Sequence, residues 1–416
     1  MTSQILSYRY PFTNPSGITA NQEQWVQTTP SNASTATSFT SNGNSNLLFN
    51  FSSNSQFLRA HQSFLTFNMT VRDAAGAPLT GAALAATRNS YQGVSAAFSR
   101  VTVRSGATII ESFQYADQLG LYLATIRPDK QRWLSLTESF GKTDAFAGTA
   151  TRKFCMQIFT SLFTQTSALP LPCLPGGLEL DFQLAGSSSF FTTDVPQFTI
   201  ESPYVRWCAV IPDVSFTLAL VGACAANRSL YLPLSELRSY RTAGLNTTNM
   251  LINCPVGSYS SVDSVTTAFY DMPAYNTLAN DKYLRWHDAG LRTWTITAAD
   301  VTNPSTRTFN HNGPDDPETA LITFLSDTGS IHTLDSTIYL QNNFYTNSFR
   351  FGLTFTSDNE GNWASGMSLV GAASTNIVVE TLHANPVPPT TIALSTVVCS
   401  VLLEISGTLL TIHRVF

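Results

Sequence analysis

Several residue groups in this sequence could carry chemistry, and the first is the triplet Gly141-Lys142-Thr143. A phosphate-binding loop ends in such a triplet, but it also needs a glycine five residues earlier, where this chain has Leu136. The sequence contains no GxSxG, HExxH or GxGxxG pattern. The usual signatures of nucleophilic, zinc and dinucleotide chemistry are therefore missing.

Two acidic loops could bind calcium through oxygen ligands or supply a pair of glycosidase carboxylates. We favour a simpler interpretation, in which solvated charges keep these turns soluble. The six histidines are scattered, and none pairs at metal-ligand spacing. The sequence therefore predicts no catalytic, cofactor-binding or metal site. The acidic residues are Asp315, Asp316 and Glu318 beside His311, and Asp358 with Glu360 in the turn at 357–362.

The six cysteines form neither a CxxC pair nor a zinc-ligand spacing. Most have apolar neighbours, which favours reduced and buried side chains. The N-terminus shows no basic segment followed by an apolar core, so we expect synthesis in a reducing cytosol without a secretory signal. The cysteines are Cys155, Cys173, Cys208, Cys224, Cys254 and Cys399.

The composition is that of a folded protein with unusually few charges. The 416 residues are 43% hydrophobic and 12% charged, about half the usual charged share. Lysine, which protein interfaces tend to exclude, occurs only four times. We therefore expect a subunit whose faces are covered by copies of itself. The net charge of −5 and the lack of a run of Lys and Arg argue against direct, sequence-specific binding of nucleic acid.

Apolar and polar residues alternate with period two along much of the chain, which predicts half-buried β-strands. Turn residues such as Ser105-Gly106 separate them, and the strands on either side of this turn are expected to form a hairpin. The strands predicted in this way span residues 65–71, 101–104, 108–110, 178–184, 205–211, 230–232, 320–325, 337–341, 349–356 and 376–381.

Two segments depart from the strand pattern. Residues 111–126 place apolar side chains at helical spacing before Pro128, which predicts a helix inserted between strands. Residues 391–412 are long enough to cross a bilayer, which needs about 20 apolar residues. Because they include Glu404 and several Ser and Thr, we expect two buried strands broken at Ser406-Gly407, and no transmembrane segment.

Many short strands, turn-rich loops and few helices predict an all-β fold with two tandem antiparallel sandwiches. The first 45 residues are rich in Ser, Thr, Asn and Gln, which favours an N-terminal arm or extended segment. The domains expected after this arm (1–45) are a first sandwich at 46–212, an Ala-rich helical or irregular connector at 213–228, and a second sandwich at 229–416.

The order of these patterns resembles the double-jelly-roll major capsid proteins of the lineage of adenoviruses, tailless bacteriophages, virophages and polinton-like viruses. The resemblance covers most of residues 50–416 and is one of pattern and order, since no single motif is diagnostic. The segments that carry it are FLRAHQSFLTFNMTV (57–71), AAFSRVTVRSGATIIESFQYADQLGLYLATI (96–126), LPLPCLPGGLELDFQL (169–184), QFTIESPYVRWCAVIPDV (197–214), FRFGLTFTSDNEGNWASGMSL (349–369), IVVETL (377–382) and LLEISGTLLTIHRVF (402–416).

The resemblance implies two eight-stranded antiparallel jelly rolls with short inserted helices. It also implies a homotrimer that forms a pseudo-hexagonal capsomer and tiles the icosahedral shell of a double-stranded DNA virus. The expected partners are neighbouring capsomers, penton proteins and minor capsid proteins, and the expected location is the virion. A protein of this family is structural, is not an enzyme and carries no cofactor.

Two other functions remain open at this point. A carbohydrate-binding or carbohydrate-active β-sandwich protein would use loop aromatics such as Trp286, Trp294 and Trp363 with the loop carboxylates, and would be a monomer. An RNA-virus coat protein would have a single jelly roll and a projecting domain. It would normally need a basic N-terminal arm, whereas the first 45 residues contain only Arg9.

Overall fold

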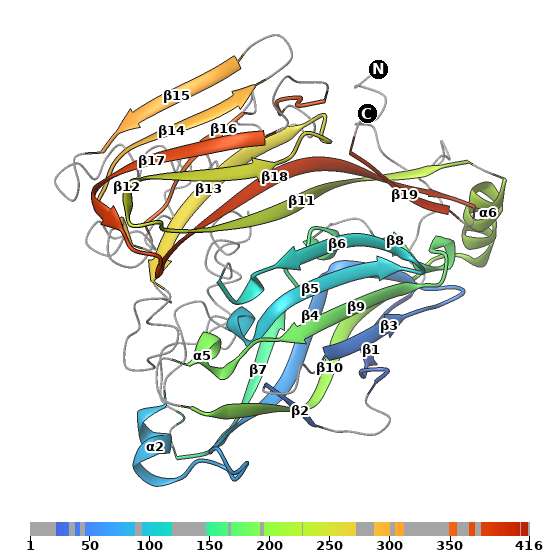
Figure 1. Cartoon of the computed structure of the whole chain (residues 1–416). Helices are drawn as coiled ribbons and strands as arrows, with labels where there is room; N and C mark the ends of the chain where they lie inside the picture. Colours follow the sequence, from blue (N-terminus) through green and yellow to red (C-terminus); the bar gives the residue numbers. More distant parts are fainter. Residues whose placement is uncertain are drawn as a thin grey trace, which may run out of the picture. The chain divides into compact units, whose positions relative to one another are not determined.

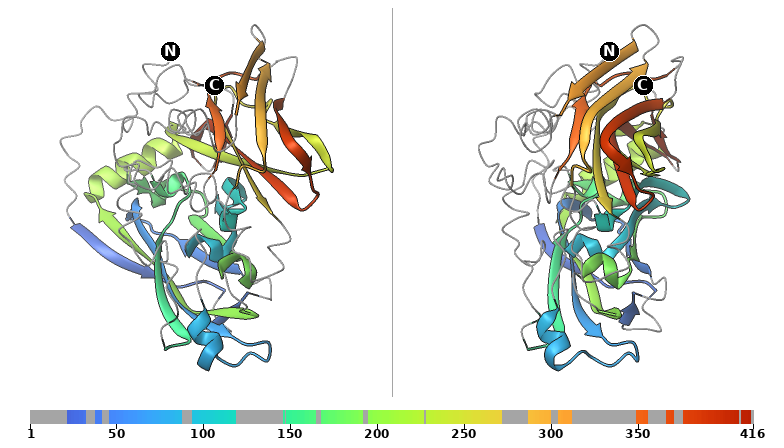
Figure 2. Two further views of the ribbon diagram at one scale, coloured as in Figure 1. Left: turned by 90° about the vertical axis from the view of Figure 1, so that its left-hand side faces the viewer. Right: turned by 60° about the vertical axis from the view of Figure 1, so that its left-hand side comes forward.

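The computed structural model shows a chain built largely from antiparallel strands, which Figure 1 and Figure 2 draw from three sides. The chain packs into two compact units. The first unit contains the described residues up to Leu234 and also Leu402–His413, and the second contains Ser235–Val401 and Arg414. The residues that the structure describes are 22–32, 38–41, 46–87, 94–118, 146, 148–164, 168–191, 195–226, 228–271, 287–299, 304–311, 349–355, 366–370, 376–407 and 409–414.

In the described part of the chain, eight main strands form the two sheets of the first roll. They are β1 (Gln22–Thr28), β3 (Asn46–Phe51), β4 (Phe57–Arg72), β5 (Phe98–Ser105), β6 (Thr108–Gln114), β7 (Thr151–Gln157), β9 (Leu178–Leu184) and β10 (Gln197–Ile211). One sheet has the order β1-β10-β4-β7, and the other has the order β3-β9-β5-β6. Two short strands extend the first sheet: β2 (Ser38–Thr40) on β10 and β8 (Leu169–Pro170) on β4.

Within the described residues, eight strands also form the two sheets of the second roll, and a further short strand extends one of them. They are β11 (Leu230–Ala243), β12 (Thr247–Pro255), β13 (Val262–Asp271), β14 (Leu291–Ala299), β15 (Pro304–Asn310), β16 (Phe351–Thr354), β17 (Asn376–Val387) and β18 (Thr391–Ser406). The sheet orders are β11-β18-β13-β16 and β12-β17-β14-β15. Strand β19 (Leu409–His413) pairs with β18.

The two rolls have the same topology. If the eight strands of either roll are numbered in chain order, one sheet reads 1-8-3-6 and the other reads 2-7-4-5. The chain therefore crosses repeatedly from one sheet to the other, which is the connectivity of a jelly roll. The predicted fold of two tandem antiparallel jelly rolls is confirmed, and the alternative with a single jelly roll does not describe this chain.

The two sheets of each roll are held together by the apolar inner faces of their strands. In β4, Leu65, Phe67, Met69 and Val71 are all at most 1% exposed, as their alternation predicts. Phe67 reaches across to Phe98 of the opposite sheet, with ring centroids 5.8 Å apart. Complete burial of one such side chain contributes about 1.5–3 kcal/mol, so the inner faces supply the main stabilisation of each roll.

Most of the predicted strands that lie in the described residues are confirmed, including the hairpin of β5 and β6 around Gly106. The segment at 391–412 forms β18 and β19 on either side of Ser406-Gly407, as expected. No helix among the described residues is long and apolar enough to cross a membrane. The predicted strands at 320–325 and 337–341 lie outside the described residues.

The predicted helix at 111–126 is wrong for its first residues, because β6 continues to Gln114. Phe113 is 1% exposed and pairs with Val101 of β5. Its partner strand and its burial outweigh the helical spacing of the apolar residues. Residues 116–118 are helical, as predicted, and residues 119–126 lie outside the described part of the chain.

The segment that we expected to be an arm or extended lead-in contributes a strand to the first roll. Strand β1 pairs antiparallel with β10 along its whole length, from Gln22 opposite Ile211 to Thr28 opposite Val205. None of its side chains is buried. A strand at the edge of a sheet with both faces accessible has no apolar alternation, so period-two patterning cannot detect it.

The described helices are short and connect the strands. Helix α6 lies in the expected connector, and the carboxylate of Asp213 caps it by accepting a hydrogen bond from the Ser215 backbone N–H at 2.7 Å. The domain boundaries drawn from the sequence remain a proposal. The helices are α2 (Gly81–Ala86), η2 (Val94–Ala97), η3 (Leu162–Thr164), η4 (Leu171–Cys173), α5 (Ser187–Phe190) and α6 (Val214–Ala225).

A buried carboxylate organises one end of the second unit. Glu236, whose side chain is 7% exposed, forms ion pairs with Arg238 at 2.5 Å and Arg414 at 3.0 Å. Tyr259 donates its hydroxyl hydrogen to the same carboxylate at 2.9 Å. Burial raises the pKa of Tyr259 to about 12, and the neighbouring negative charge of Glu236 acts in the same direction. The network therefore fixes Arg414 near the C-terminus onto strand β11.

We predict that Glu236→Gln lowers the free energy of unfolding by about 2–4 kcal/mol, because two arginines lose their shared buried counter-charge. The matched control is Glu380→Gln, which removes an exposed carboxylate of the same unit and should change the stability by under about 0.5 kcal/mol. Urea unfolding of both variants measures the difference. Equal stability of the two variants would contradict a structural role for the network.

Candidate functional site

The residues singled out for chemistry in the sequence do not come together in the described structure. The Gly141-Lys142-Thr143 triplet and both acidic loops lie outside the described residues. His311 is 1% exposed and packs against Phe349, with ring centroids 5.4 Å apart. Within the described ranges, no three His, Cys, Asp or Glu side chains form a group that could hold a metal ion.

Trp294 is a correction to the carbohydrate-binding alternative. We expected this residue in a loop, but it lies in β14, is fully buried and stacks on Phe309 with ring centroids 5.2 Å apart. A buried ring cannot stack on a sugar. Trp286 and Trp363 lie outside the described residues. Trp294, the one described residue of the three that motivated this alternative, is therefore not available to bind a sugar.

One described cluster contains the residue types of a catalytic triad. Glu404 accepts hydrogen bonds from the hydroxyl groups of Ser229 and Tyr231, and His413 Nε2 lies 2.5 Å from its Oε2 atom. The hydrogen bond from Ser229 is the main cause of a lowered pKa of Glu404, and His413 and Tyr231 act in the same direction. The cluster lies where the hairpin of β18 and β19 meets the start of β11.

The order of these groups does not suit catalysis. In a nucleophilic triad, the imidazole lies between the hydroxyl and the carboxylate, so that it can remove the hydroxyl proton. Here the carboxylate lies between Ser229 and His413, so a hydrogen bond joins each of them to Glu404. The arrangement can hold the C-terminal hairpin in place, but His413 is not positioned to activate Ser229.

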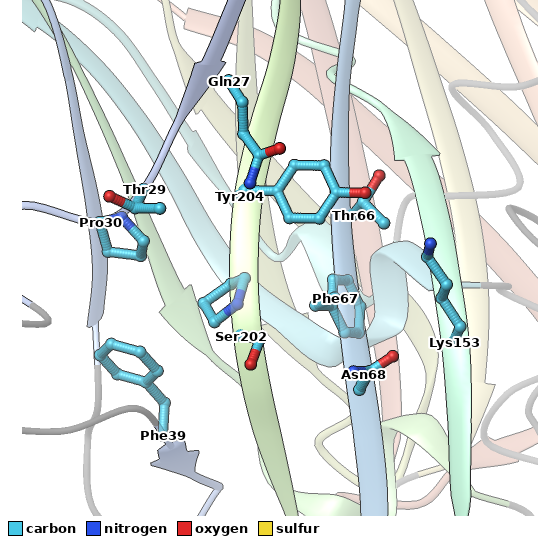
Figure 3. A pocket seen from close by; sticks show the side chains of 11 residues that line it. Gln27, Thr29, Pro30, Phe39, Thr66, Phe67, Asn68, Lys153, Ser202 and Tyr204 are labelled. Atoms are coloured by element: carbon cyan, nitrogen blue, oxygen red, sulfur yellow. The ribbon is translucent and has the colours of Figure 1, made fainter.

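The outer face of the sheet β1-β10-β4-β7 carries a hollow. Two adjoining cavities of about 400 and 600 Å³ share Thr66, Lys153 and Tyr204. Figure 3 shows the Tyr204 ring between Gln27 of β1 and Thr66 of β4, with Lys153 on β7 beyond them. Such a concave, partly apolar surface is suited to binding another molecule.

A β-bulge in β10 shapes this hollow. The register shifts between Glu201, which faces Asn68, and Tyr204, which faces Thr66, so β10 has one residue more than β4 over this stretch. Ser202 takes up the extra residue with a φ of +47°, a conformation that non-glycine residues rarely adopt. The bulge directs Tyr204 and Pro203 toward the hollow, which both residues line.

The charges around this hollow are uneven. Lys153 and Arg206 line it together with Trp25 and Tyr204, and none of the described lining residues is a carboxylate. The guanidinium of Arg206 lies over the Trp25 ring, 5.5 Å from the centroid, which is a cation–π contact. Trp25 is 51% exposed, which is unusual for so large an aromatic residue. The first roll therefore presents a cationic, aromatic surface.

The second roll presents an outer face of a different character. A hollow of about 460 Å³ on the sheet β12-β17-β14 is lined by Leu245, Leu251 and Leu382, which are 78%, 51% and 42% exposed. Glu380, opposite Leu251 in the sheet, is the one charged residue among the described residues that line it. Asn249, Thr293, Thr295 and Thr381 also line it, so exposed leucines and polar side chains are mixed on this surface.

Neither surface was recognised from the sequence. Trp25 lies in a polar segment whose strand has no alternation, and Tyr204 owes its position to a bulge that only the pairing reveals. The Ser-Pro pair before Tyr204 is the one local signal, because proline disturbs a sheet ladder and marks bulges.

Comparisons with known proteins agree on the fold. No family model matches the sequence, and no curated protein sequence matches it. The structure is similar to PBCV-1 VP54, fitted into a reconstruction of the virophage Sputnik, with a TM-score of 0.64 and 13% identity over 94% of this chain and 96% of that chain.

Two further solved structures give the same result. A quasi-atomic model of the PBCV-1 virus capsid has a TM-score of 0.64 at 12% identity, and covers 94% of this chain and 96% of that chain. The Faustovirus major capsid protein has a TM-score of 0.60 at 10% identity, and covers 92% of this chain and 90% of that chain. The predicted resemblance to double-jelly-roll capsid proteins is thus confirmed at the level of the fold.

The Glu404 cluster generates a pH-dependent prediction. The pKa of the Glu404 carboxyl lies below its ordinary value of 4.5, so the carboxylate form stabilises the folded state. This stabilisation is lost as the pH falls through the pKa of the folded state. Glu404→Gln should therefore be less stable than the wild type by about 1 kcal/mol at pH 7. The difference should vanish once the pH is well below 4.5. Thermal unfolding across this range measures it, and a difference independent of pH would contradict the assignment.

Proposed function

We propose that this chain is the major capsid protein of an icosahedral double-stranded DNA virus, a structural protein and not an enzyme. Three copies would form a pseudo-hexagonal capsomer, and capsomers would tile the shell. Neighbouring capsomers, penton proteins and minor capsid proteins are the proposed partners. The proposed location is the virion, after synthesis in the host cytoplasm.

The observation that carries this proposal is the repeated strand order. Two jelly rolls of identical topology in one chain give six similar rolls in a trimer, which is a physical route to a nearly six-fold building block. The likeness to the PBCV-1 capsid model extends over 94% of the chain, so both rolls contribute to it.

The surfaces of the rolls support self-assembly. Groups that become buried between copies must not carry unpaired charges, because desolvation of a charge costs several kcal/mol. On the outer face of the first roll, Arg59 pairs with Glu23 at 2.6 Å and Arg72 pairs with Glu201 at 2.9 Å. The charged fraction is also low, at 12%. Few charges would therefore become buried without a partner when copies associate.

We predict that the purified chain is a trimer at micromolar concentration. Size-exclusion chromatography with light scattering should give three times the chain mass of 45.2 kDa, or larger assemblies. A stable monomer at this concentration would contradict the proposal, because a capsomer must hold together before a shell can form.

We further predict that Trp25→Asp weakens association by tenfold or more, because large exposed aromatics are typical anchors of interfaces. The control is Gln22→Asp, an exposed residue of the same strand, which should leave association unchanged. Sedimentation equilibrium of both variants measures the change. If Trp25→Asp assembles like the wild type while circular dichroism shows an intact fold, this face is not an interface.

A further inference from the structure

Two cysteines far apart in sequence lie side by side in the first unit. Cys173 is the last residue of η4, and Cys224 lies in the final turn of α6. Helix α6 packs against η4, and the two thiol groups are hydrogen-bonded to each other. Both side chains are buried, at 5% and 3% exposure.

The surroundings hold this pair in place. Asp213 caps the first turn of α6, and the Gly407 backbone N–H donates a hydrogen bond to the Cys224 carbonyl at 2.8 Å. η4 is fixed between β8 and the turn at Gly176-Gly177 that precedes β9. The two segments that carry the thiols are therefore each held by contacts of their own.

The other cysteines provide a contrast. The thiol of Cys155 accepts a hydrogen bond from the Thr66 hydroxyl at 3.6 Å, and the thiol of Cys254 is hydrogen-bonded to Ser395. Cys155 is also more exposed than Cys173 or Cys224. If exposure alone decided reactivity, Cys155 would be oxidised first. If the proximity of a second thiol decides it, the stable product forms at the buried pair.

The hydrogen bond makes the two thiols unequal. Donation by the Cys173 thiol lowers the pKa of Cys224, and the same contact raises the pKa of Cys173. Cys224 therefore loses its proton more readily than Cys173 and is the one that forms the reactive thiolate.

We propose that Cys173 and Cys224 are a redox site, at which a hydroperoxide converts the two thiols into an intramolecular disulfide. The Cys224 sulfur attacks the peroxide, so that an S–O bond forms, the O–O bond breaks and one water leaves. The Cys173 sulfur then attacks the resulting sulfenic acid, the S–S bond forms, the S–O bond breaks and a second water leaves. Two thiols lose two electrons, and one hydrogen peroxide gains them.

The bond would tie α6 to the first roll. It would close a loop between residues 173 and 224, which limits the freedom of the unfolded chain and raises the melting temperature by roughly 5–10 °C. The site does not depend on the proposed function. In a capsid, it would stay reduced during assembly in the cytosol and would be oxidised after release of the particle.

The experiment treats the purified full-length chain with a small excess of hydrogen peroxide at pH 7. Thiol titration of the unfolded protein should fall from six to four groups, and peptide mapping should recover Cys173 joined to Cys224. Dithiothreitol should restore all six. The proposal is overturned if Cys155 is oxidised while Cys173 and Cys224 stay free, or if Cys224 accumulates as sulfinic acid without joining Cys173.

Variants separate the disulfide from general oxidation. Cys173→Ser should lose the rise in melting temperature, and its Cys224 should be trapped as sulfenic acid by dimedone. Cys254→Ser, which also removes a buried thiol, should keep the disulfide and the rise. Mapping of the wild type needs no variant, so poor folding of Cys173→Ser would leave the test intact. Light scattering of the oxidised and reduced protein reports on the capsomer separately.

Discussion

The structure depends on the burial of two apolar sheet faces against each other, twice in one chain. Phe67 and Phe98 join the sheets of the first roll at 5.8 Å, and Trp294 and Phe351 join those of the second at 5.0 Å. Because the sheets must stay about 10 Å apart to bury such rings, the inner faces are fixed and the outer faces are free to vary. The rolls can therefore keep one topology while they present different surfaces.

The inner faces are also what the sequence predicts well. The alternation from Leu65 to Val71 fixes which side of β4 is buried, since a shift of one residue would expose every apolar side chain. The features that were not predicted lack this constraint. Strand β1 is an edge strand without a buried face, and β6 takes its conformation from its pairing with β5. Tyr204 lines its hollow because a bulge at Ser202 displaces it. A bulge is an irregularity in strand pairing, so the alternation of apolar and polar residues does not reveal it.

The candidate surfaces lie on the outer faces of the sheets, which the core does not constrain. The first roll offers Trp25, Arg206 and Lys153, and the second offers exposed leucines beside Glu380. The described lining of the first hollow carries positive charge, and that of the second carries the carboxylate of Glu380. The titratable clusters inside the fold have structural roles instead: Glu236 binds two arginines, and the carboxylate of Glu404 separates a serine from a histidine.

The most direct test of the central claim is a cryo-electron microscopy reconstruction of the purified protein at a resolution that traces strands. The account predicts a three-fold particle with a six-lobed outline, in which each chain contributes two rolls with the strand orders 1-8-3-6 and 2-7-4-5. A reconstruction in which one half of the chain is a different fold, or in which the strand orders of the two rolls differ, would contradict it.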